Sequence, residues 1–129
     1  MNYKALEQKI IKSYTEGVTL DDAEKLAGEF LEAQIKTSEE IKKLDLNARL
    51  IKATLKESKA KLFVTEATKG DKKPSDTLLN ALVDSDGTIN EVQQAFDEAE
   101  VERDEIFRMF SIFQNAHLHY RAISKGKFE

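Results

Sequence analysis

Residues 19–69 read TLDDAEKLAGEFLEAQIKTSEEIKKLDLNARLIKATLKESKAKLFVTEATK, and this stretch decides the fold. Steps of three and four residues alternate along it for about five heptads, which is typical of a coiled-coil seam. No proline interrupts the stretch, and Gly28 is its last glycine. It therefore predicts one long helix over residues 19–69. Eight of the twelve seam positions are apolar. The twelve positions are Ala27, Phe30, Gln34, Thr37, Ile41, Leu44, Ala48, Ile51, Leu55, Ser58, Leu62 and Thr65.

The same alternation returns near the C-terminus and predicts a second long helix over residues 88–125. Thr88 and Glu91 have the spacing of a capping box at its start, and Gly126 follows as a stop. Eight of the eleven positions in this row are apolar or aromatic. The eleven positions are Ile89, Val92, Phe96, Ala99, Arg103, Ile106, Phe110, Phe113, His117, Tyr120 and Ser124. Arg103 is polar on this seam, so we expect it to pair with an acid on the neighbouring helix.

Two shorter helices complete the predicted fold. Apolar residues at helical spacing predict a helix over residues 2–16, after which Gly17 and Thr19 provide a stop and an N-cap. Ser75 caps a connector helix over residues 75–84. Two long helices joined by a short connector must fold back on each other. We therefore predict an all-α fold, a coiled-coil-like antiparallel helical hairpin with short N-terminal and connector helices, forming a single domain over residues 1–129.

Composition narrows the function classes. The 129 residues include no cysteine, which excludes disulfides, thiolate metal sites and cysteine nucleophiles. The N-terminus carries charge where a signal peptide needs an apolar run, and no apolar stretch approaches the length of a membrane span. We therefore expect a cytoplasmic protein with no membrane partner.

Patterns typical of catalysis are missing from the sequence. His117 and His119 lie two residues apart, so on a helix they point in nearly opposite directions and cannot share a metal. His117 falls on the seam, where a hydrogen-bonded core histidine is the simpler interpretation. We expect no enzyme, with no catalytic residues, no metal and no cofactor.

A further apolar row lies off the main seam of the first long helix. One partner helix cannot cover both rows, so either the short helices or another subunit must cover the second. We predict a homo-oligomer whose interface includes Phe107 and the members of this row, which Glu57 interrupts: Leu46, Leu50, Ala53, Ala60 and Val64.

Charge is segregated along the chain. Residues 42–73 carry ten Lys or Arg against four acids, whereas residues 84–105 carry nine acids against Arg103. The basic residues recur at steps of three and four beside the seam, as Arg49, Lys52, Lys56 and Lys59, and Lys61 continues the charge. They either pair with the acids of residues 97–105 or form a track for nucleic-acid phosphates, because evenly spaced cations neutralise a backbone without reading its sequence.

Residues 58–65, Ser-Lys-Ala-Lys-Leu-Phe-Val-Thr, resemble the Leu-Lys-Ala-Arg-Leu-Asp-Tyr-Tyr DNA-binding motif of UvsY-type recombination mediators of tailed phages. Lys59, Ala60 and Leu62 match the motif, and Lys61 replaces its arginine conservatively. Phe63, Val64 and Thr65 depart from it, and Val64 and Thr65 stand where the motif has its two tyrosines. The similarity in helix order extends over residues 25–126.

The resemblance implies a ring-forming homo-oligomer that acts in the host cytoplasm. It would bind single-stranded DNA non-specifically, help displace single-strand-binding protein and load a RecA-like recombinase. Of the candidate residues, the motif itself implies a DNA-binding role for Lys59 and Lys61. Two interpretations without nucleic acid stay open: a helical phage structural or scaffolding protein, and an anti-defence or regulatory factor that binds other proteins.

Overall fold

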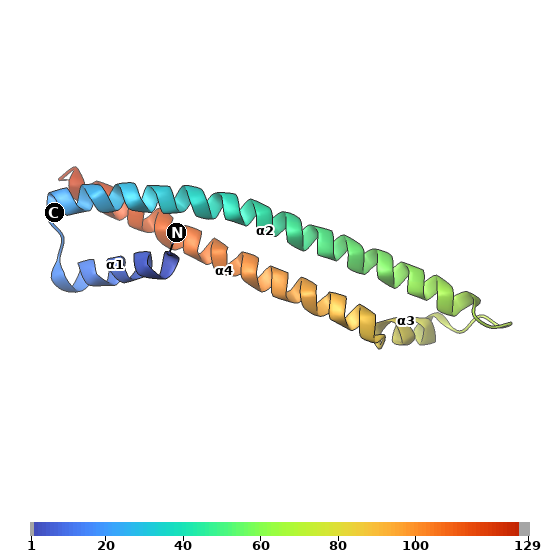
Figure 1. The fold of residues 1–129 in the computed structure, drawn as a ribbon. Coiled ribbons are helices and arrows are strands. Elements are labelled where there is room, and N and C mark those ends of the chain that lie inside the picture. Colours follow the sequence, from blue (N-terminus) through green and yellow to red (C-terminus); the bar gives the residue numbers. More distant parts are fainter. Residues whose placement is uncertain (1, 127–129) are drawn as a thin grey trace. The chain divides into compact units, whose positions relative to one another are not determined.

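The computed structural model describes residues 2–126, and the fold is all-α (Figure 1). The four helices are α1 (Tyr3–Glu16), α2 (Leu20–Thr68), α3 (Asp76–Asp84) and α4 (Gly87–Ser124). Helices make up 88% of the structure, and the described residues contain no strand. Each helix begins and ends within one residue of its predicted bounds, so the all-α prediction is confirmed.

Capping residues explain where three of the helices begin or end. The Thr19 hydroxyl accepts a hydrogen bond from the Asp22 amide at 3.2 Å, and the Ser75 hydroxyl accepts one from Leu78 at the same distance. Both caps were predicted and both are confirmed. Gly17 has a φ of 79°, a left-handed conformation that glycine adopts without steric cost and that ends α1.

The start of α4 differs from the prediction. The carboxylate of Asp86, rather than the Thr88 hydroxyl, accepts a hydrogen bond from the Ile89 amide at 3.0 Å. The helix consequently begins at Gly87, one residue earlier than the capping-box pattern indicated. A negatively charged acceptor also interacts favourably with the positive end of the helix dipole. This interaction favours Asp86 over Thr88 as the N-cap.

The chain divides into two compact units. Unit 1 comprises residues 1–42 and 104–129, and unit 2 comprises residues 43–103. Within each unit, a segment of α2 runs antiparallel to a segment of α4, which confirms the helical hairpin. That the units fold together as the single domain expected from the length stays a prediction.

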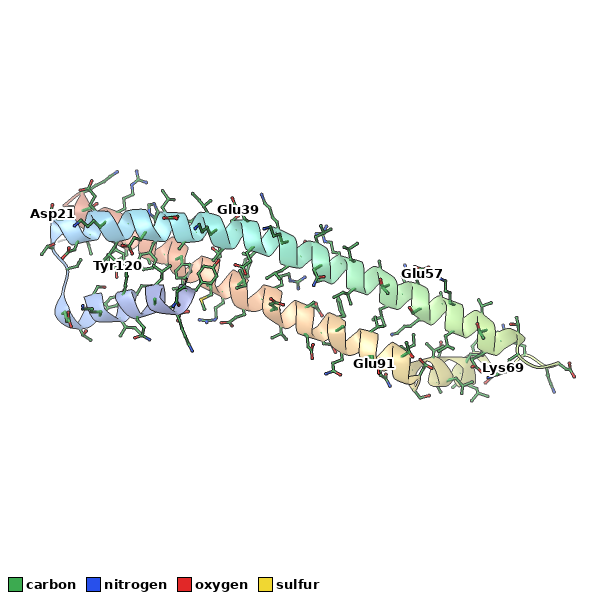
Figure 2. The ribbon with its side chains drawn as sticks, viewed as in Figure 1. Asp21, Glu39, Glu57, Lys69, Glu91 and Tyr120 are labelled. Atoms are coloured by element: carbon green, nitrogen blue, oxygen red, sulfur yellow. The ribbon has the colours of Figure 1, made fainter. Side chains whose placement is uncertain are left out.

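Unit 1 has an aromatic core formed by three helices. Phe30, Phe113 and Tyr120 are fully buried. The ring centroid of Phe30 lies 5.7 Å from that of Phe113 and 5.6 Å from that of Tyr120, which Figure 2 labels between the helices. Helix α1 covers this cluster with the buried Leu6 and with Tyr3, whose ring centroid lies 5.7 Å from that of Phe113.

Polar contacts fasten α1 to the rest of unit 1. The Tyr3 hydroxyl donates a 2.6 Å hydrogen bond to Glu40 on α2, and Lys9 forms a 2.6 Å ion pair with Glu29. Burial of the phenol, the hydrogen bond to Glu40 and the negative charge of that carboxylate raise the pKa of Tyr3 to about 12. Helix α1 is therefore held by specific polar groups as well as by apolar packing.

Unit 2 has a sparser core built from small and aliphatic side chains. Its buried residues are Ala48, Leu55, Leu79, Val83, Ile89 and Ala99. Leu79 and Val83 come from α3, which leads into the start of α4 (Figure 1). Arg103 of α4 reaches Asp45 of α2 at 3.3 Å, which confirms that this polar seam residue pairs with an acid on the neighbouring helix.

Candidate nucleic-acid interface

The predicted basic stripe lies on the unit 2 part of α2. Arg49, Lys52 and Lys56 are exposed, and Lys59 is half-buried. Steps of three and four residues keep all four within a sector of the helix surface about 80° wide, at about 100° per residue. The stripe lies beside the seam that carries Ala48 and Leu55, as the sequence indicated.

Intramolecular pairing involves one end of the stripe. Arg49 forms a 3.0 Å ion pair with Asp45 one turn earlier, although its side chain remains 76% exposed. Within residues 2–126, no ion pair joins Lys52, Lys56 or Lys59 to a carboxylate. Three consecutive cations of the stripe are thus available to an external anion.

The acids predicted as alternative partners are engaged elsewhere. Asp97 and Glu98 accept hydrogen bonds from the glutamines four residues before them, at 3.0 and 3.1 Å. Glu105 is held at 2.6 Å by Arg108, whose hydrogen bond holds the pKa of that carboxyl below its usual range. In the described residues, the basic stripe therefore forms no ion pair with the acidic segment of α4.

Lys61 is separated from the stripe. It follows Lys59 by two residues on a continuous helix, so the two side chains project about 200° apart. Lys61 Nζ lies 2.9 Å from the carboxylate of Glu57, and this hydrogen bond lowers the pKa of Glu57. The four stripe residues are brought together, and Lys61 is not among them.

The segment that resembles the mediator motif is helical throughout, inside α2. Phe63 is half-buried and Val64 is 60% exposed. The Thr65 hydroxyl donates to the Lys61 carbonyl at 2.9 Å, within its own helix. Only Lys59 of the two motif lysines therefore shares a face with the stripe.

The second apolar row is exposed. Leu46 and Leu50 are each 59% exposed, and Ala53 and Ala60 are also exposed. In Figure 2, Glu57, which interrupts the row, lies on the side of α2 that faces away from α4. Phe107 of unit 1, the other predicted interface residue, is 56% exposed. The row therefore stays accessible to solvent in the single chain.

An apolar groove of 340 Å³ lies between α2 and α4 of unit 2, lined by Leu50, Ile51, Thr54, Glu91, Val92 and Ala95. Leu50 and Lys52 project about 200° apart, so the groove and the basic stripe lie on different sides of α2. A polyanion bound along the stripe would not need to enter the groove.

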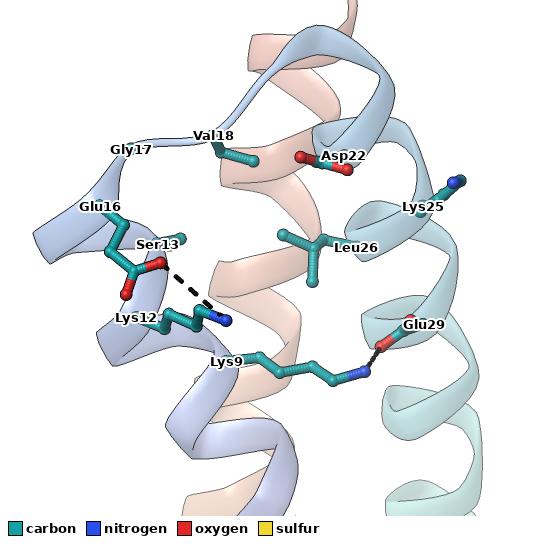
Figure 3. Close-up of a pocket in the computed structure, with 10 residues that line it drawn as sticks. All are labelled: Lys9, Lys12, Ser13, Glu16, Gly17, Val18, Asp22, Lys25, Leu26 and Glu29. Carbon is teal, nitrogen blue, oxygen red and sulfur yellow. Dashed lines mark hydrogen bonds and ion pairs between the residues drawn. The ribbon is translucent and has the colours of Figure 1, made fainter.

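Figure 3 shows a polar depression of 340 Å³ in unit 1, between α1 and the start of α2. Lys9, Lys12 and Lys25 contribute positive charge, and Glu16, Asp22 and Glu29 balance it. Two of the lysines are paired, Lys9 with Glu29 at 2.6 Å and Lys12 with Glu16 at 3.9 Å. Its balanced and paired charges give the depression no preference for a charged ligand.

Both histidines lie in unit 1. His117 Nδ1 lies 2.8 Å from the Ala27 carbonyl oxygen, so His117 is hydrogen-bonded within the core as predicted. The ring of His119 stacks against Tyr14, with centroids 5.8 Å apart. Among residues 2–126, no group of three or more His, Asp or Glu is placed to hold a metal ion. In the same range, no helix has an apolar stretch long enough to cross a bilayer.

Sequence reasoning overlooked Gly28, which is exposed on α2 away from both cores. A Cβ atom added there would meet nothing within 4 Å, so packing inside the chain does not explain the glycine. Gly28 lies three residues before the exposed Leu31, on the side of α2 opposite the seam. This spacing was the signal in the sequence that could have drawn attention to it.

Comparisons with family models, with curated proteins and with solved structures find no match to this chain. The candidate interface therefore stands on its own residues and geometry.

Proposed function

We propose that this protein binds single-stranded DNA non-specifically through the phosphates, with Arg49, Lys52, Lys56 and Lys59 as the contact residues. One observation carries the proposal: Lys52, Lys56 and Lys59 form a row along α2 without an ion-pair partner in the described residues. A rigid helix holds these cations at regular spacing. Such a row matches the repeating charge of a nucleic-acid backbone and has no means of reading bases.

The proposed biological role is that of a recombination mediator, which assists the loading of a RecA-like recombinase and the displacement of single-strand-binding protein. Support for this role comes from the resemblance of residues 58–65 to the mediator motif and from the hairpin architecture. We further propose that the protein acts as a homo-oligomer, since assembly would multiply the number of basic stripes that one DNA strand contacts.

A second candidate function is structural: a helical assembly or scaffolding protein that acts through protein contacts alone. The observation that favours it is the exposed apolar row of α2, with Leu46 and Leu50 each 59% exposed. Apolar surface of this kind is typical of protein–protein contact. The two functions are separated by salt-sensitive DNA binding, which the structural role does not require.

Fluorescence anisotropy with labelled single-stranded oligonucleotides of differing sequence tests the proposal. Wild-type protein should bind all sequences alike, with a log–log salt slope of about −0.7 per phosphate contact. Substituting Lys52, Lys56 and Lys59 together by Ala should flatten the slope by about two and leave the helicity intact. The matched control replaces Lys4 and Lys25, exposed lysines of unit 1, and should leave the slope unchanged. Absence of binding by the wild-type protein at low salt would refute the function.

The two motif lysines provide a sharper comparison. If the stripe geometry determines binding, Lys59→Ala weakens DNA binding and Lys61→Ala does not, because Lys61 projects to another side of α2 and pairs with Glu57. If the motif acts as a unit, the two substitutions weaken binding equally. The ratio of the two dissociation constants distinguishes these accounts.

A further inference from the structure

The side of unit 1 that faces away from α1 carries two rows of residues, which we call the outer rows. Both rows follow alternating steps of four and three residues, the spacing of a coiled-coil seam. The outer row of α2 consists of Glu24, Gly28, Leu31, Ile35, Ser38 and Lys42. The outer row of α4 consists of Asp104, Phe107, Ser111, Gln114, Leu118 and Arg121.

Contacts inside unit 1 fix the orientation of the outer rows. On α2, Glu29 and Glu40 bind side chains of α1, and each lies two residues from a member of the row. On α4, Met109 packs against the core and His119 stacks against Tyr14 of α1, and each again lies two residues from a member. Two residues correspond to about 200° of helix rotation. The outer rows therefore point away from α1.

The large apolar side chains of the outer rows are exposed. Leu31 and Ile35 of α2 are 42% and 53% exposed. Phe107 and Leu118 of α4 are 56% and 55% exposed. Helix α1 covers one side of the α2–α4 pair in unit 1, and these four residues lie on the other. Exposed apolar groups at seam spacing indicate a packing partner for this side.

Charged residues lie at both ends of the outer rows. Because α2 and α4 are antiparallel, Glu24 and Arg121 lie at one end, and Lys42 and Asp104 lie at the other. In the part of the chain that the structure describes, no ion pair involves Glu24, Lys42 or Arg121. Each end thus carries one acid and one base, and the two helices exchange signs from one end to the other.

Each outer row is symmetric in character about its midpoint. Around Ala33, the α2 row pairs apolar with apolar, small with small and acid with base: Leu31 with Ile35, Gly28 with Ser38, and Glu24 with Lys42. Around the midpoint of the α4 row, polar pairs with polar, apolar with apolar and acid with base: Ser111 with Gln114, Phe107 with Leu118, and Asp104 with Arg121. Two antiparallel copies of either row would therefore match along their whole length.

The two midpoints lie at the same level of unit 1. The ring of Phe30 packs against those of Phe113 and Tyr120, and the Ala27 carbonyl oxygen lies 2.8 Å from His117 Nδ1. Continued along the antiparallel helices, these contacts place Ala33 level with roughly residues 110–117 of α4. The midpoint of the α4 row, between Ser111 and Gln114, falls in this range. One two-fold axis can therefore relate both rows at once.

We infer that two copies of this chain pair through the outer rows of unit 1, with α2 antiparallel to α2 and α4 antiparallel to α4 of the second copy. Leu31 lies opposite Ile35 of the second copy, and Phe107 opposite Leu118. The two-fold axis repeats each contact, and every charged end meets the opposite sign. No residue of the basic stripe takes part. This inference rests on the assembly part of the proposed function and names the surface that assembles.

Gly28 has a role in this pairing. A glycine inside a long helix destabilises it relative to alanine, and a Cβ atom added here would meet nothing within 4 Å in the single chain. In the pair, Gly28 faces the small Ser38 of the second copy. Two small residues at opposing positions allow the backbones of the two α2 helices to come close.

Other apolar surfaces of the chain fit the outer rows less well. Helix α3 exposes Leu78 and Leu82, but its charged residues, Asp76 and Asp84, are both acidic. Docked on the outer rows, α3 would bring an acid towards the acid present at either end. The exposed row of α2 in unit 2 carries Glu57 in its middle, where the outer rows are apolar. A second copy of the same face matches both the apolar centre and the charged ends.

Disulfide cross-linking tests the register, because the chain has no cysteine of its own. Mixed copies carrying Gly28→Cys and Ser38→Cys should form a disulfide-linked dimer under mild oxidation, since these positions face each other. Each variant alone should not, because two copies of one position lie about 15 Å apart along the pair, beyond the reach of a disulfide. Absence of the mixed dimer, or cross-linking of Gly28→Cys to Leu118→Cys in its place, overturns the register.

A charge exchange tests the ends. One variant carries Glu24→Lys and the other carries Lys42→Glu. Each variant alone should dimerise about tenfold more weakly than the wild-type protein in analytical ultracentrifugation, because like charges meet at both symmetry-related contacts. An equimolar mixture should restore the wild-type affinity, because both contacts then join opposite charges. A mixture that stays as weak as its components contradicts the pairing.

Apolar substitutions compare this face with unit 2. Ile35→Asp and Leu118→Asp should each abolish the dimer and keep the helicity, because both side chains are exposed in the single chain. Leu50→Asp and Leu82→Asp, the matched controls, alter exposed residues of unit 2 and should leave the mass unchanged. Dimer loss in the controls but not in Ile35→Asp would assign the interface to unit 2. That result, or a monomeric wild-type protein at tens of micromolar, refutes the inference.

Failure of this inference is distinguishable from failure of DNA binding. The masses are measured without DNA, and Ile35→Asp alters no residue of the basic stripe. A monomeric protein that still shifts single-stranded DNA would refute the interface and leave the DNA-binding proposal standing. A dimer that binds no DNA would do the reverse.

Discussion

The two units are built from the same two long helices, yet they bury different kinds of residue. In unit 1, α1 adds a third helix, and Phe30, Phe113 and Tyr120 are completely buried between the three. In unit 2, two helices and the short α3 enclose mainly alanine and aliphatic side chains. The difference follows from the length of the third helix, because α1 spans 14 residues and α3 spans only 9.

This difference assigns the units different tasks. Unit 1 has close packing and polar contacts between helices, and both stabilise the fold. Unit 2 leaves its cations and its apolar row uncovered, and it holds all four residues of the proposed DNA-binding stripe. Substitutions should therefore affect stability most in unit 1 and binding most in unit 2.

The largest expected effect is in the unit 1 core. Phe113→Ala should lower the free energy of unfolding by about 3–5 kcal/mol, because it leaves a cavity among rings that are fully packed. Urea denaturation followed by circular dichroism measures the change. Phe107→Ala is the matched control: its ring is 56% exposed, and its loss should change stability by about 0.5 kcal/mol or less.

The corresponding change in unit 2 should be smaller. Leu55 is 7% exposed, and its neighbour Ile51 lines the open groove. Leu55→Ala should lower the free energy of unfolding by about 2–3 kcal/mol, at the lower end of the range for buried leucines, since the groove lets the site relax. A loss as large as that of Phe113→Ala, measured in the same urea titration, would contradict the contrast between the two cores.

Because of the Tyr3–Glu40 contact, the stability of unit 1 should change with pH in the alkaline range. The pKa of Tyr3 is about 12 in the folded protein and about 10 when unfolded. The unfolded chain therefore loses this proton first, and the contribution of Tyr3 to stability is complete below pH 10 and declines towards pH 12. Tyr3→Phe should lower stability by about 1.5 kcal/mol at neutral pH. Urea titrations from pH 8 to pH 11 should give a less steep decline for the variant than for the wild-type protein; an equal decline would refute this role for Tyr3.

The smallest effect should be a gain. Gly28→Ala should stabilise unit 1 by about 0.5–1 kcal/mol, because alanine is the better helix former and its methyl group meets no neighbouring atom. Thermal melting at low protein concentration, where association does not contribute, measures the gain. A lower melting temperature would show that the outer face of α2 is already occupied within the chain.

Much of the fold could be predicted from the sequence because helical periodicity and caps are local signals. The seam of α2, the caps at Thr19 and Ser75 and the pairing of Arg103 with an acid on the neighbouring helix all follow from spacing and residue type. The cap at Asp86 was missed because Asp86 and Thr88 are both residue types that cap helices, and pattern alone does not rank them.

The candidate site was less predictable because partners depend on tertiary structure. The sequence could not decide whether the stripe pairs with α4. In the structure, Asp97 and Glu98 accept hydrogen bonds within their own helix instead. Lys61 was grouped with the stripe by sequence proximity, although helical rotation separates it from Lys59. The contact between Tyr3 and Glu40 joins residues far apart in the chain, and no local pattern indicates it.

Hydrogen exchange followed by mass spectrometry, with and without a single-stranded oligonucleotide, tests the division of tasks most directly. Without DNA, peptides from the α1 and Phe113 region of unit 1 should exchange more slowly than peptides from residues 43–68 of unit 2. With DNA, protection should rise over residues 49–59 and stay unchanged over α1. Slower exchange in unit 2 than in unit 1 without DNA, or DNA-induced protection confined to unit 1, would contradict the account.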